Sequence, residues 1–325
     1  MVLTNQDFIE SYDSRYKKGY MEGWPQAKKD RVKKYLVSLQ LPAMGVALDF
    51  GCGKGDFTSV LKEALPLWDV YGCDISAVAL DMARMKIVNC TFLTMEEIKH
   101  SGMKFNLLFS HHVIEHVPDL LPVFSDFGGL VDQDGYMIHI LPSRCENTFE
   151  HWVAKSANDG INTELGNRYY FEHPGHLRRL SAHEFSRYCI EQGFTVTQQN
   201  FSNKIFGTLN WITATDTKFI KNMFDISRVS RGLHKLFFLI LQVFFVMVSL
   251  LRAPFIQLPK AYAKRKKSKR KYLLFLSFLC LYPFSFMIDK VISFFAEIEW
   301  LLYRKSGSEM YLFSKRVENK LYTNA

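Results

Sequence analysis

The sequence predicts an α/β fold: a doubly wound, mostly parallel, seven-stranded sheet of the Rossmann-like kind with a helical hydrophobic insert between its last two strands. Strand-like and helix-like segments alternate from about residue 45 to 142, as in parallel sheets covered on both faces. A turn with three glycines, LDFGCGKGDF at 48–57, joins the first strand to the first helix. Two long apolar runs separate the last two strand-like segments.

The predicted strands are apolar or alternating segments, and the predicted helices carry apolar residues at helical spacing. The strands lie at 45–50, 69–74, 90–94, 105–110, 135–141, 194–201 and 309–317, and the helices at 56–65, 77–86 and 181–193. In the last helix, Ser181 and Glu184 match a capping box and Gly193 matches a C-cap. The polar, aromatic stretch after Pro142 predicts a long lid or substrate loop.

The net charge of +9 comes from one segment, because 260–271 holds eight basic residues and no acid, which leaves about +1 (9 minus 8) for the rest. This distribution argues against a nucleic-acid-binding face spread over the fold. The six cysteines show no C-x-x-C spacing, and the first residues lack the pattern of a secretory signal. We therefore expect reduced thiols and a cytosolic catalytic domain.

The glycine turn predicts a site for a nucleotide-like ligand, because glycine lets the backbone turn sharply and lets a ligand approach the main chain. Asp74 ends the second strand, 19 residues beyond Gly55 (74 minus 55), where a carboxylate can accept the hydroxyls of a ribose. Two simpler interpretations are a tight turn for the glycines and an N-cap for Asp74. Phe57 and Thr58 break the G-x-G-x-x-G spacing of dinucleotide folds, and Asp49 suits a cationic methionine end, which favours S-adenosylmethionine over a dinucleotide.

Four motifs, in this order and spacing, resemble those of the class I S-adenosylmethionine-dependent methyltransferases: LDFGCGKGDF, VYGCDIS, FNLLFSHHVIEHVPD and DGYMIHILP. The resemblance covers roughly residues 45–200 and is nearest to the branch of ubiquinone-biosynthesis O-methyltransferases and polysaccharide-pathway methyltransferases. SYDSRYKKGYMEGW at 11–24 is similar to the aromatic segment that often precedes these motifs.

The resemblance implies a set of contacts to S-adenosylmethionine. They are Asp49, Gly51, Cys52 and Gly53 at the methionine end, Asp74 at the ribose, Ile75 against the adenine and Ser110 beneath the sulfonium. Two positions depart from the family pattern. Thr94 and Met95, with Glu96 as a substitute, stand where an acid usually meets the adenine amine, and Asn106 stands where an aspartate is common.

The segment HHVIEH at 111–116 supplies the predicted catalytic residues, His112, Glu115 and His116. Methyl transfer to a hydroxyl needs alignment and a base, and histidine is suited to take the proton. The same letters spell H-x-x-E-H, an inverted zinc-peptidase signature, but no third ligand is evident and no metal site is predicted. A divalent ion near this turn and a purely structural role for Glu115 and His116 are the other interpretations.

Further candidates lie in FEHPGHLRRL at 171–180. His173 and His176 are positioning or structural residues in our interpretation. Arg178 and Arg179 could hold an anionic acceptor such as a phosphate or uronate, or could simply be solvated arginines at a helix entry.

The apolar runs at 236–251 and 272–288 have 16 and 17 residues without a charge, slightly short of the ~20 that span a bilayer. A buried helical core is one interpretation, and membrane association is the preferred one. If each run crossed the bilayer, the basic segment at 260–271 would lie on the far side, against the positive-inside rule. Pro254, which we expect to end the first helix, and Pro283, within the second run, favour helices that bend back or lie shallowly.

We therefore divide the chain into an N-terminal helical and aromatic segment (1–44), a cofactor-binding core (45–202), a hydrophobic helical insert that associates with a membrane (203–305), and the last strand with a tail (306–325). We expect a methyltransferase at the cytoplasmic face of a membrane, held there by residues 235–300 and by anionic lipid. Its expected acceptor is hydrophobic or lipid-linked, an oxygen of a saccharide or of an isoprenoid-type molecule. The alternatives are an inactive, membrane-anchored adaptor and a metal-dependent hydrolase.

Overall fold

The computed structural model describes residues 5–20 and 23–317 and divides into two compact units. The sheet unit comprises Met1–Leu141, His183–Gln199 and Tyr311–Ala325, and the helical unit comprises Pro142–Ala182 and Asn200–Met310. The segment boundaries drawn from the sequence stay predictions, and their parts at 1–4, 21–22 and 318–325 lie outside the described residues.

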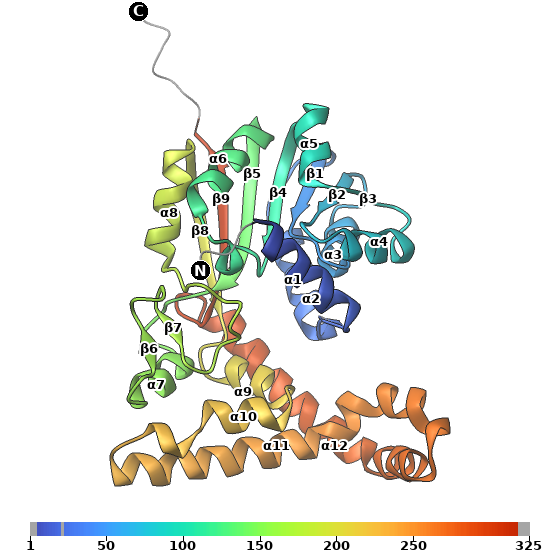
Figure 1. Ribbon diagram of the computed structural model, residues 1–325, viewed down its shortest axis with the longest axis vertical. Helices are drawn as coiled ribbons and strands as arrows, with labels where there is room; N and C mark the ends of the chain where they lie inside the picture. The colour runs from blue at the N-terminus through green and yellow to red at the C-terminus, as the bar shows by residue number, and fades with distance from the viewer. Residues whose placement is uncertain (1–4, 21–22, 318–325) are drawn as a thin grey trace, which may run out of the picture. The chain divides into compact units, whose positions relative to one another are not determined.

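Seven strands form one sheet in the order β3-β2-β1-β4-β5-β9-β8 (Figure 1). They are β1 (Val46–Phe50), β2 (Asp69–Cys73), β3 (Thr91–Leu93), β4 (Phe105–His111), β5 (Val131–Pro142), β8 (Phe194–Ser202) and β9 (Glu309–Arg316). The pairs β1–β2, β2–β3, β1–β4 and β4–β5 are parallel. The strand order reverses between β1 and β4, and ligands of open α/β sheets bind at the carboxyl ends of the strands at such a point.

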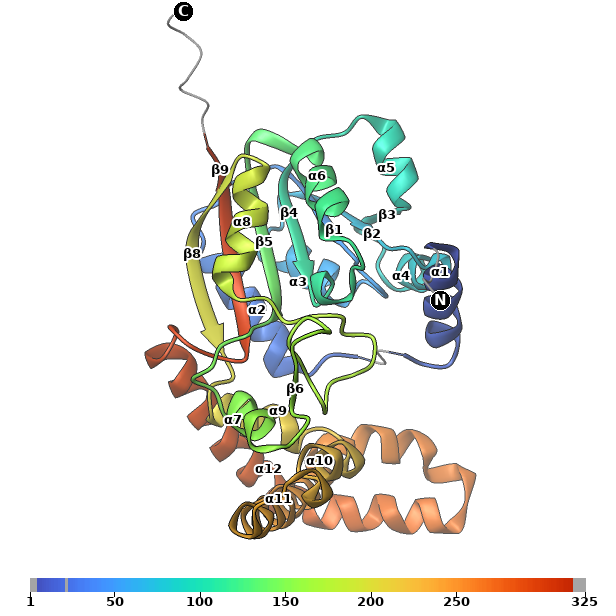
Figure 2. The ribbon, with the colours of Figure 1, turned by 60° about the vertical axis from the view of Figure 1, so that its left-hand side comes forward.

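Helices cover both faces of the sheet, which confirms the predicted doubly wound fold. They are α1 (Asn5–Lys17), α2 (Gln26–Ser38), α3 (Asp56–Ala64), α4 (Ala77–Lys86), α5 (Met95–Ser101), α6 (Leu120–Leu130) and α8 (Ala182–Glu191). In Figure 2, α6 and α8 lie in front of the sheet, and α2 and α3 lie behind it.

The last two strands run in opposite directions. Val317 N donates to Gly193 O (2.9 Å) at one end of the pair, and Ser308 N donates to Asn203 O (3.2 Å) at the other. All residues between β8 and β9 belong to a helical insert, as the sequence predicted.

The helical unit contains α7 (Phe149–Ser156), a two-stranded ribbon of β6 (Ile161–Asn162) and β7 (Arg168–Tyr169), α9 (Phe206–Thr213), α10 (Thr217–Met223), α11 (Gly232–Lys264) and α12 (Lys269–Leu302). Its core joins the segment after Pro142 to the insert. The core members are Val153, Ala154, Tyr169, Phe171, Ile212, Ile220, Met223, Phe224, Val229, Phe238 and Phe245. Contrary to our prediction, the stretch after Pro142 is therefore not a loop outside the core, because it contains α7, β6 and β7 and contributes Tyr169 and Phe171 to the core.

Two buried acids attach α12 to α9. The carboxylate of Glu299 accepts the backbone N–H groups of residues 204–207 at 2.7–3.0 Å, and thereby caps the start of α9. Asp289 pairs with Arg252 of α11 (Oδ1 to Nη2, 2.5 Å), and Arg252 also donates to Asn210 and Thr213 of α9. A carboxylate is stabilised at the N-terminus of a helix, where it accepts N–H bonds. A buried charge is stabilised when it is paired and hydrogen-bonded.

The sequence predicted that the first apolar helix ends at Pro254. This prediction is wrong, because α11 continues to Lys264. Proline lacks an N–H and strains the preceding turn, so a following N–H needs another acceptor. Here Phe255 N donates to Ser285 Oγ of α12 (2.9 Å), which satisfies a backbone group next to the proline. Figures 1 and 2 show that α11 bends between its first half and its orange end. Gly232–Lys267 and Lys269–Leu302 are long and apolar enough to cross a membrane, by length and composition.

Candidate cofactor and active site

The turn after β1 requires glycine. Gly51, Gly53 and Gly55 have φ values of 72°, 53° and 76°, in the left-handed region that favours glycine. A Cβ on Gly51 would lie 2.4 Å from the Val113 side chain, and one on Gly53 would lie 2.8 Å from the Tyr16 hydroxyl. The turn is fixed to β2 because Gly51 N and Cys52 N both donate to Cys73 O (2.8 and 2.9 Å). The backbone conformation and the packing of the turn therefore both require glycine.

Asp74 holds the same turn from the end of β2. Its Oδ2 accepts Gly53 N (2.8 Å), and its Oδ1 accepts Ser76 N (2.9 Å). The N-cap of α4 is Ser76, whose side chain accepts Ala79 N, so the N-cap interpretation of Asp74 is wrong. Burial raises the pKa of Asp74, although backbone N–H bonds from Ser76, Gly53 and Ile75 oppose the shift.

Asp49 is fully buried at the end of β1, and its Oδ2 accepts the hydroxyl of Thr58 on α3 (2.6 Å). Burial raises the pKa of Asp49 to about 7; the Thr58 bond opposes this shift, and the charge of Asp74 adds to it. The side chain therefore holds or releases a proton close to neutral pH.

The other predicted cofactor contacts differ in exposure. Ile75 is 51% exposed beside Asp74, whereas Cys52 is buried under the glycine turn. Ser110 is buried and bonded to His139 (Oγ to Nδ1, 2.7 Å), and burial lowers the pKa of His139 to about 3, so that the imidazole is neutral. The place of Ser110 beneath the sulfonium stays a prediction.

Two residues that departed from the family pattern have local structural roles. Thr94 is the N-cap of α5 in a capping box with Glu97, while Glu96 is exposed in the first turn of that helix. Asn106 Oδ1 accepts Val46 N (2.9 Å) at the start of β1.

Aromatic residues of the N-terminal segment surround this site, and sequence reasoning gave them no role. Asp13 of α1 accepts the Ser76 hydroxyl (2.5 Å), and Tyr16 lies over Gly53. Trp24 lies against His111 and His112, with ring centroids 4.7 and 5.2 Å apart. The high aromatic content of 11–24 could have indicated a role in the site. The residues that these aromatic side chains contact could not be predicted from local spacing.

The predicted catalytic residues lie at the end of β4. Nδ1 of His112 is 3.0 Å from Oε1 of Glu115, whose side chain is 1% exposed. The His116 ring meets the edge of Tyr12, with centroids 6.4 Å apart. His112 has a φ of 54°, rare for a residue with a Cβ, and Ile114–His116 is a single 3₁₀ turn. His112 and His116 are therefore not one turn apart on an α-helix, as the zinc-peptidase signature requires.

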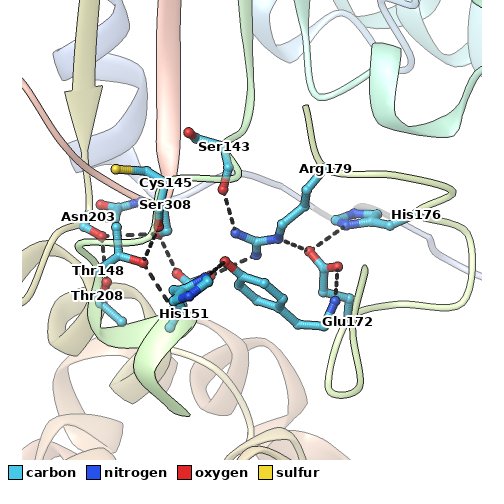
Figure 3. Close-up of polar contacts among 12 residues, drawn as sticks. Ser143, Cys145, Thr148, His151, Glu172, His176, Arg179, Asn203, Thr208 and Ser308 are labelled. Carbon is cyan, nitrogen blue, oxygen red and sulfur yellow. Dashed lines mark hydrogen bonds and ion pairs between the residues drawn. The ribbon is translucent and has the colours of Figure 1, made fainter. Parts of the chain in front are cut away.

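The helical unit uses Arg179 as a buried connector (Figure 3). The guanidinium donates to Glu172 Oε1 (2.6 Å), Glu150 Oε2 (2.8 Å) and Ser143 O (3.0 Å), and lies over the Tyr169 ring. Burial alone would raise the pKa of Glu172, but the Arg179 charge and its other partners lower it to about 2. Arg179 is thus neither solvated nor a free anion ligand, contrary to both expectations.

The neighbouring histidines are positioned within this unit. His176 Nδ1 lies 3.5 Å from Glu172 Oε1, and His173 Nδ1 accepts Gly175 N (3.0 Å). Their roles as positioning or structural residues stay predictions.

Residues 21–199, more than half of the chain, match a family model described as a methyltransferase domain. The chain belongs to this methyltransferase family. The membership confirms the predicted fold class, the enzyme class and S-adenosylmethionine as the cofactor.

Several relatives share parts of this domain. The trans-aconitate 2-methyltransferases of Methylobacterium radiotolerans and an Enterobacter species are 25% and 24% identical over 108 and 115 residues, or 33% and 34% of this chain. The match spans less than half of their own length, 42% and 44%. The structure of magnesium protoporphyrin IX methyltransferase from Synechocystis with bound SAH is 22% identical, with a TM-score of 0.43, and the alignment covers 60% of this chain and 90% of that one.

The residues at the turn fit S-adenosylmethionine. The Asp74 carboxylate accepts backbone N–H groups of Gly53, Ser76 and Ile75, and its lone pairs leave room for a further bond from a ribose hydroxyl. The absence of Cβ atoms on Gly51 and Gly53 lets Val113 and the Tyr16 hydroxyl pack against the main chain of the turn. The bound cofactor would supply an activated methyl group, and Asp74 and the turn would hold its nucleoside.

Replacing Asp74 by Ala is expected to weaken binding of S-adenosylmethionine by about 1.5–3 kcal/mol, because the ribose loses a charged acceptor. Titration calorimetry measures this, with circular dichroism as the check on folding and exposed Asp81→Ala on α4 as the control. Unchanged affinity in a folded Asp74 variant would refute the ribose assignment.

The raised pKa of Asp49 makes the sheet unit less stable as pH rises. An acid whose pKa is about 7 when folded and ~3.9 when unfolded binds more protons in the folded state between these values. The contribution of Asp49 to the free energy of unfolding is therefore fully present below the pKa of the unfolded state. It is lost as the pH rises through the pKa of the folded state. Asp49→Asn should flatten this slope, which is at most ~1.4 kcal/mol per pH unit.

Urea unfolding at about pH 5 and about pH 8, followed by hydrogen exchange of the β1 peptide, tests this expectation. Asp69→Asn, at an exposed position on β2, is the control. An identical pH slope in the native chain and in Asp49→Asn would contradict the prediction.

Proposed function

We propose that this chain transfers a methyl group from S-adenosylmethionine to an oxygen of a hydrophobic acceptor, a lipid-linked saccharide or an isoprenoid-type molecule, at the cytoplasmic face of a membrane. The observation that carries the chemistry is the His112–Glu115 pair next to the glycine turn. Val113, between these residues, packs against the position where Gly51 lacks a Cβ. The proposed cofactor loop and the proposed base therefore belong to adjacent segments of the sheet unit.

In this proposal His112 is the general base. Nδ1–H of His112 donates a hydrogen bond to the Glu115 carboxylate, and this leaves Nε2 as the basic nitrogen toward an acceptor hydroxyl. The same arrangement of a carboxylate that orients a histidine recurs in enzymes that activate hydroxyl groups. His116, next to Tyr12, is the second candidate base. Methyl transfer is an in-line displacement, so the remaining task of the site is to align donor and acceptor.

The acceptor class rests on the helical unit. α11 and α12 expose large apolar side chains over much of their length, and a basic segment connects them. Contiguous exposed apolar surface of this kind is typical of membrane or lipid contact. An enzyme held at a bilayer meets acceptors that are dissolved in it, which supports a lipid-linked substrate and the polysaccharide-pathway or ubiquinone-type branch.

The direct test is incubation of the purified full chain with S-adenosylmethionine labelled in its methyl group and a membrane lipid extract. Mass analysis then identifies the molecule that gains a methyl group. We expect a methyl ether in the lipid fraction. Transfer only to a water-soluble acid, or only to nitrogen, would overturn the acceptor class, and no transfer despite cofactor binding would favour an inactive adaptor.

In the same assay, His112→Ala is expected to lower turnover roughly 10²–10⁴-fold with cofactor affinity nearly intact, because a base acts on the acceptor. If His116 is the base, its Ala variant will show this loss instead. His100→Ala, on the exposed face of α5, is the control. Full turnover in both site variants would return them to structural roles, and loss of activity with a chelator would indicate a divalent ion.

A further inference from the structure

The first half of α11 has an outward face made of large apolar side chains. Its exposed residues recur at helical spacing and form one stripe: Leu233, Leu236, Phe237, Leu239, Ile240, Val243, Phe244, Met247, Leu250 and Leu251. We call this set the outer stripe. A helix on the surface of a water-soluble protein carries polar residues on this side.

The polar side chains of 236–251 point the other way, into the helical unit. Gln242 and Ser249 are the polar residues of this run. Gln242 donates to Phe224 O (3.1 Å) next to α10, and Ser249 donates to Thr215 O (3.4 Å) between α9 and α10. The polarity of α11 is therefore inverted: polar atoms face the protein and apolar atoms face outward.

The inner face of α11 is occupied by protein, which restricts how the helix can meet a bilayer. Phe238 and Phe245 belong to the core of the helical unit, and Arg252 is paired with Asp289 and bonded to α9. A helix that crossed the bilayer here would carry α9 and α10, with their polar ends, into the hydrocarbon layer, which is costly. A helix lying in the membrane plane exposes to lipid only the outer stripe.

The basic segment of the helical unit indicates the kind of surface that would bind beside the outer stripe. Eight basic residues and no acid occupy 260–271, at the end of α11 and the start of α12. All of them except Arg265 are exposed. Segments of this charge repel one another, whereas anionic lipid attracts them.

We infer that the outer stripe and the basic segment 260–271 form one docking surface for an anionic bilayer leaflet, with the first half of α11 lying in the plane of the interface. The inference deepens the membrane location proposed above, and it does not depend on methyl transfer. Apolar burial holds the stripe, and headgroup charge holds the basic segment. Figures 1 and 2 show α9 and α10 on one side of α11, with its other side open.

Flotation of the full chain with vesicles of phosphatidylcholine, with and without phosphatidylglycerol, measures this docking without substrate. We expect binding that increases with phosphatidylglycerol and weakens with salt. The double variant Ile240→Glu/Val243→Glu should lower vesicle affinity at least about 10-fold. The charge reversal Lys266→Glu/Lys267→Glu should lower it about 10-fold on anionic vesicles and change little on neutral ones.

The control is Val88→Glu, at a position on the sheet unit that is 95% exposed, which should float like the native chain. All variants are also assayed for binding of S-adenosylmethionine, so a folding defect is recognised and a failure of docking is separated from a failure of the enzyme. Equal flotation of the stripe variant and the Val88 variant, with cofactor binding intact in both, would overturn the docking surface.

Labelling decides between an in-plane helix and a spanning hairpin. A cysteine placed at Ser268, in a Cys280→Ser background, is treated in intact cells with a membrane-impermeant thiol reagent. For the in-plane arrangement we expect labelling only after permeabilisation, because the basic segment stays at the inner leaflet. Labelling of intact cells would mean that the helices cross, and would overturn the arrangement.

Discussion

The hydrogen bonds between the ends of β1 and β2 are the constraint on which the candidate site depends. Cys73 O receives the N–H groups of Gly51 and Cys52, and the carboxylate of Asp74 receives that of Gly53. These bonds fix a left-handed turn that a side chain would obstruct, and they place a carboxylate at its edge. Val113 packs against Gly51, so the same constraint positions the segment after β4 that carries His112 and Glu115.

Local patterns in the sequence were sufficient to predict the sheet. Strand ends fell within a few residues of the predicted ones except at β5, which starts earlier, at Val131, and β1–β4 and the glycine turn formed as expected. The fold class was predicted from the motif set, because motifs in a fixed order and spacing are typical of one arrangement of strands and helices. Periodicity and turn chemistry are properties of neighbouring residues, and this is the information that a single sequence carries best.

Contacts between distant residues could not be predicted in the same way. Asp13 meets Ser76 across 63 positions, and the buried partners of Arg179 lie 36, 29 and 7 positions away. Arg179 was predicted as an anion ligand or a solvated arginine because its acidic partners are distant in the sequence, and only the fold surrounds it with two acids. The inverted polarity of α11 was hidden for a similar reason: an apolar run with two polar residues does not show which side meets protein.

The Arg252–Asp289 pair also orders events during synthesis. Asn210 and Thr213, which accept from Arg252, leave the ribosome before it, whereas Asp289 follows 37 residues later. During that interval Arg252 carries a charge with neutral partners only, and a buried charge without its counterion is unfavourable. Arg252 can therefore be buried against α9 with its counterion only once α12 has been made as far as Asp289. Synthesis of α12 as far as Asp289 thus completes the ion pair that joins α9, α11 and α12.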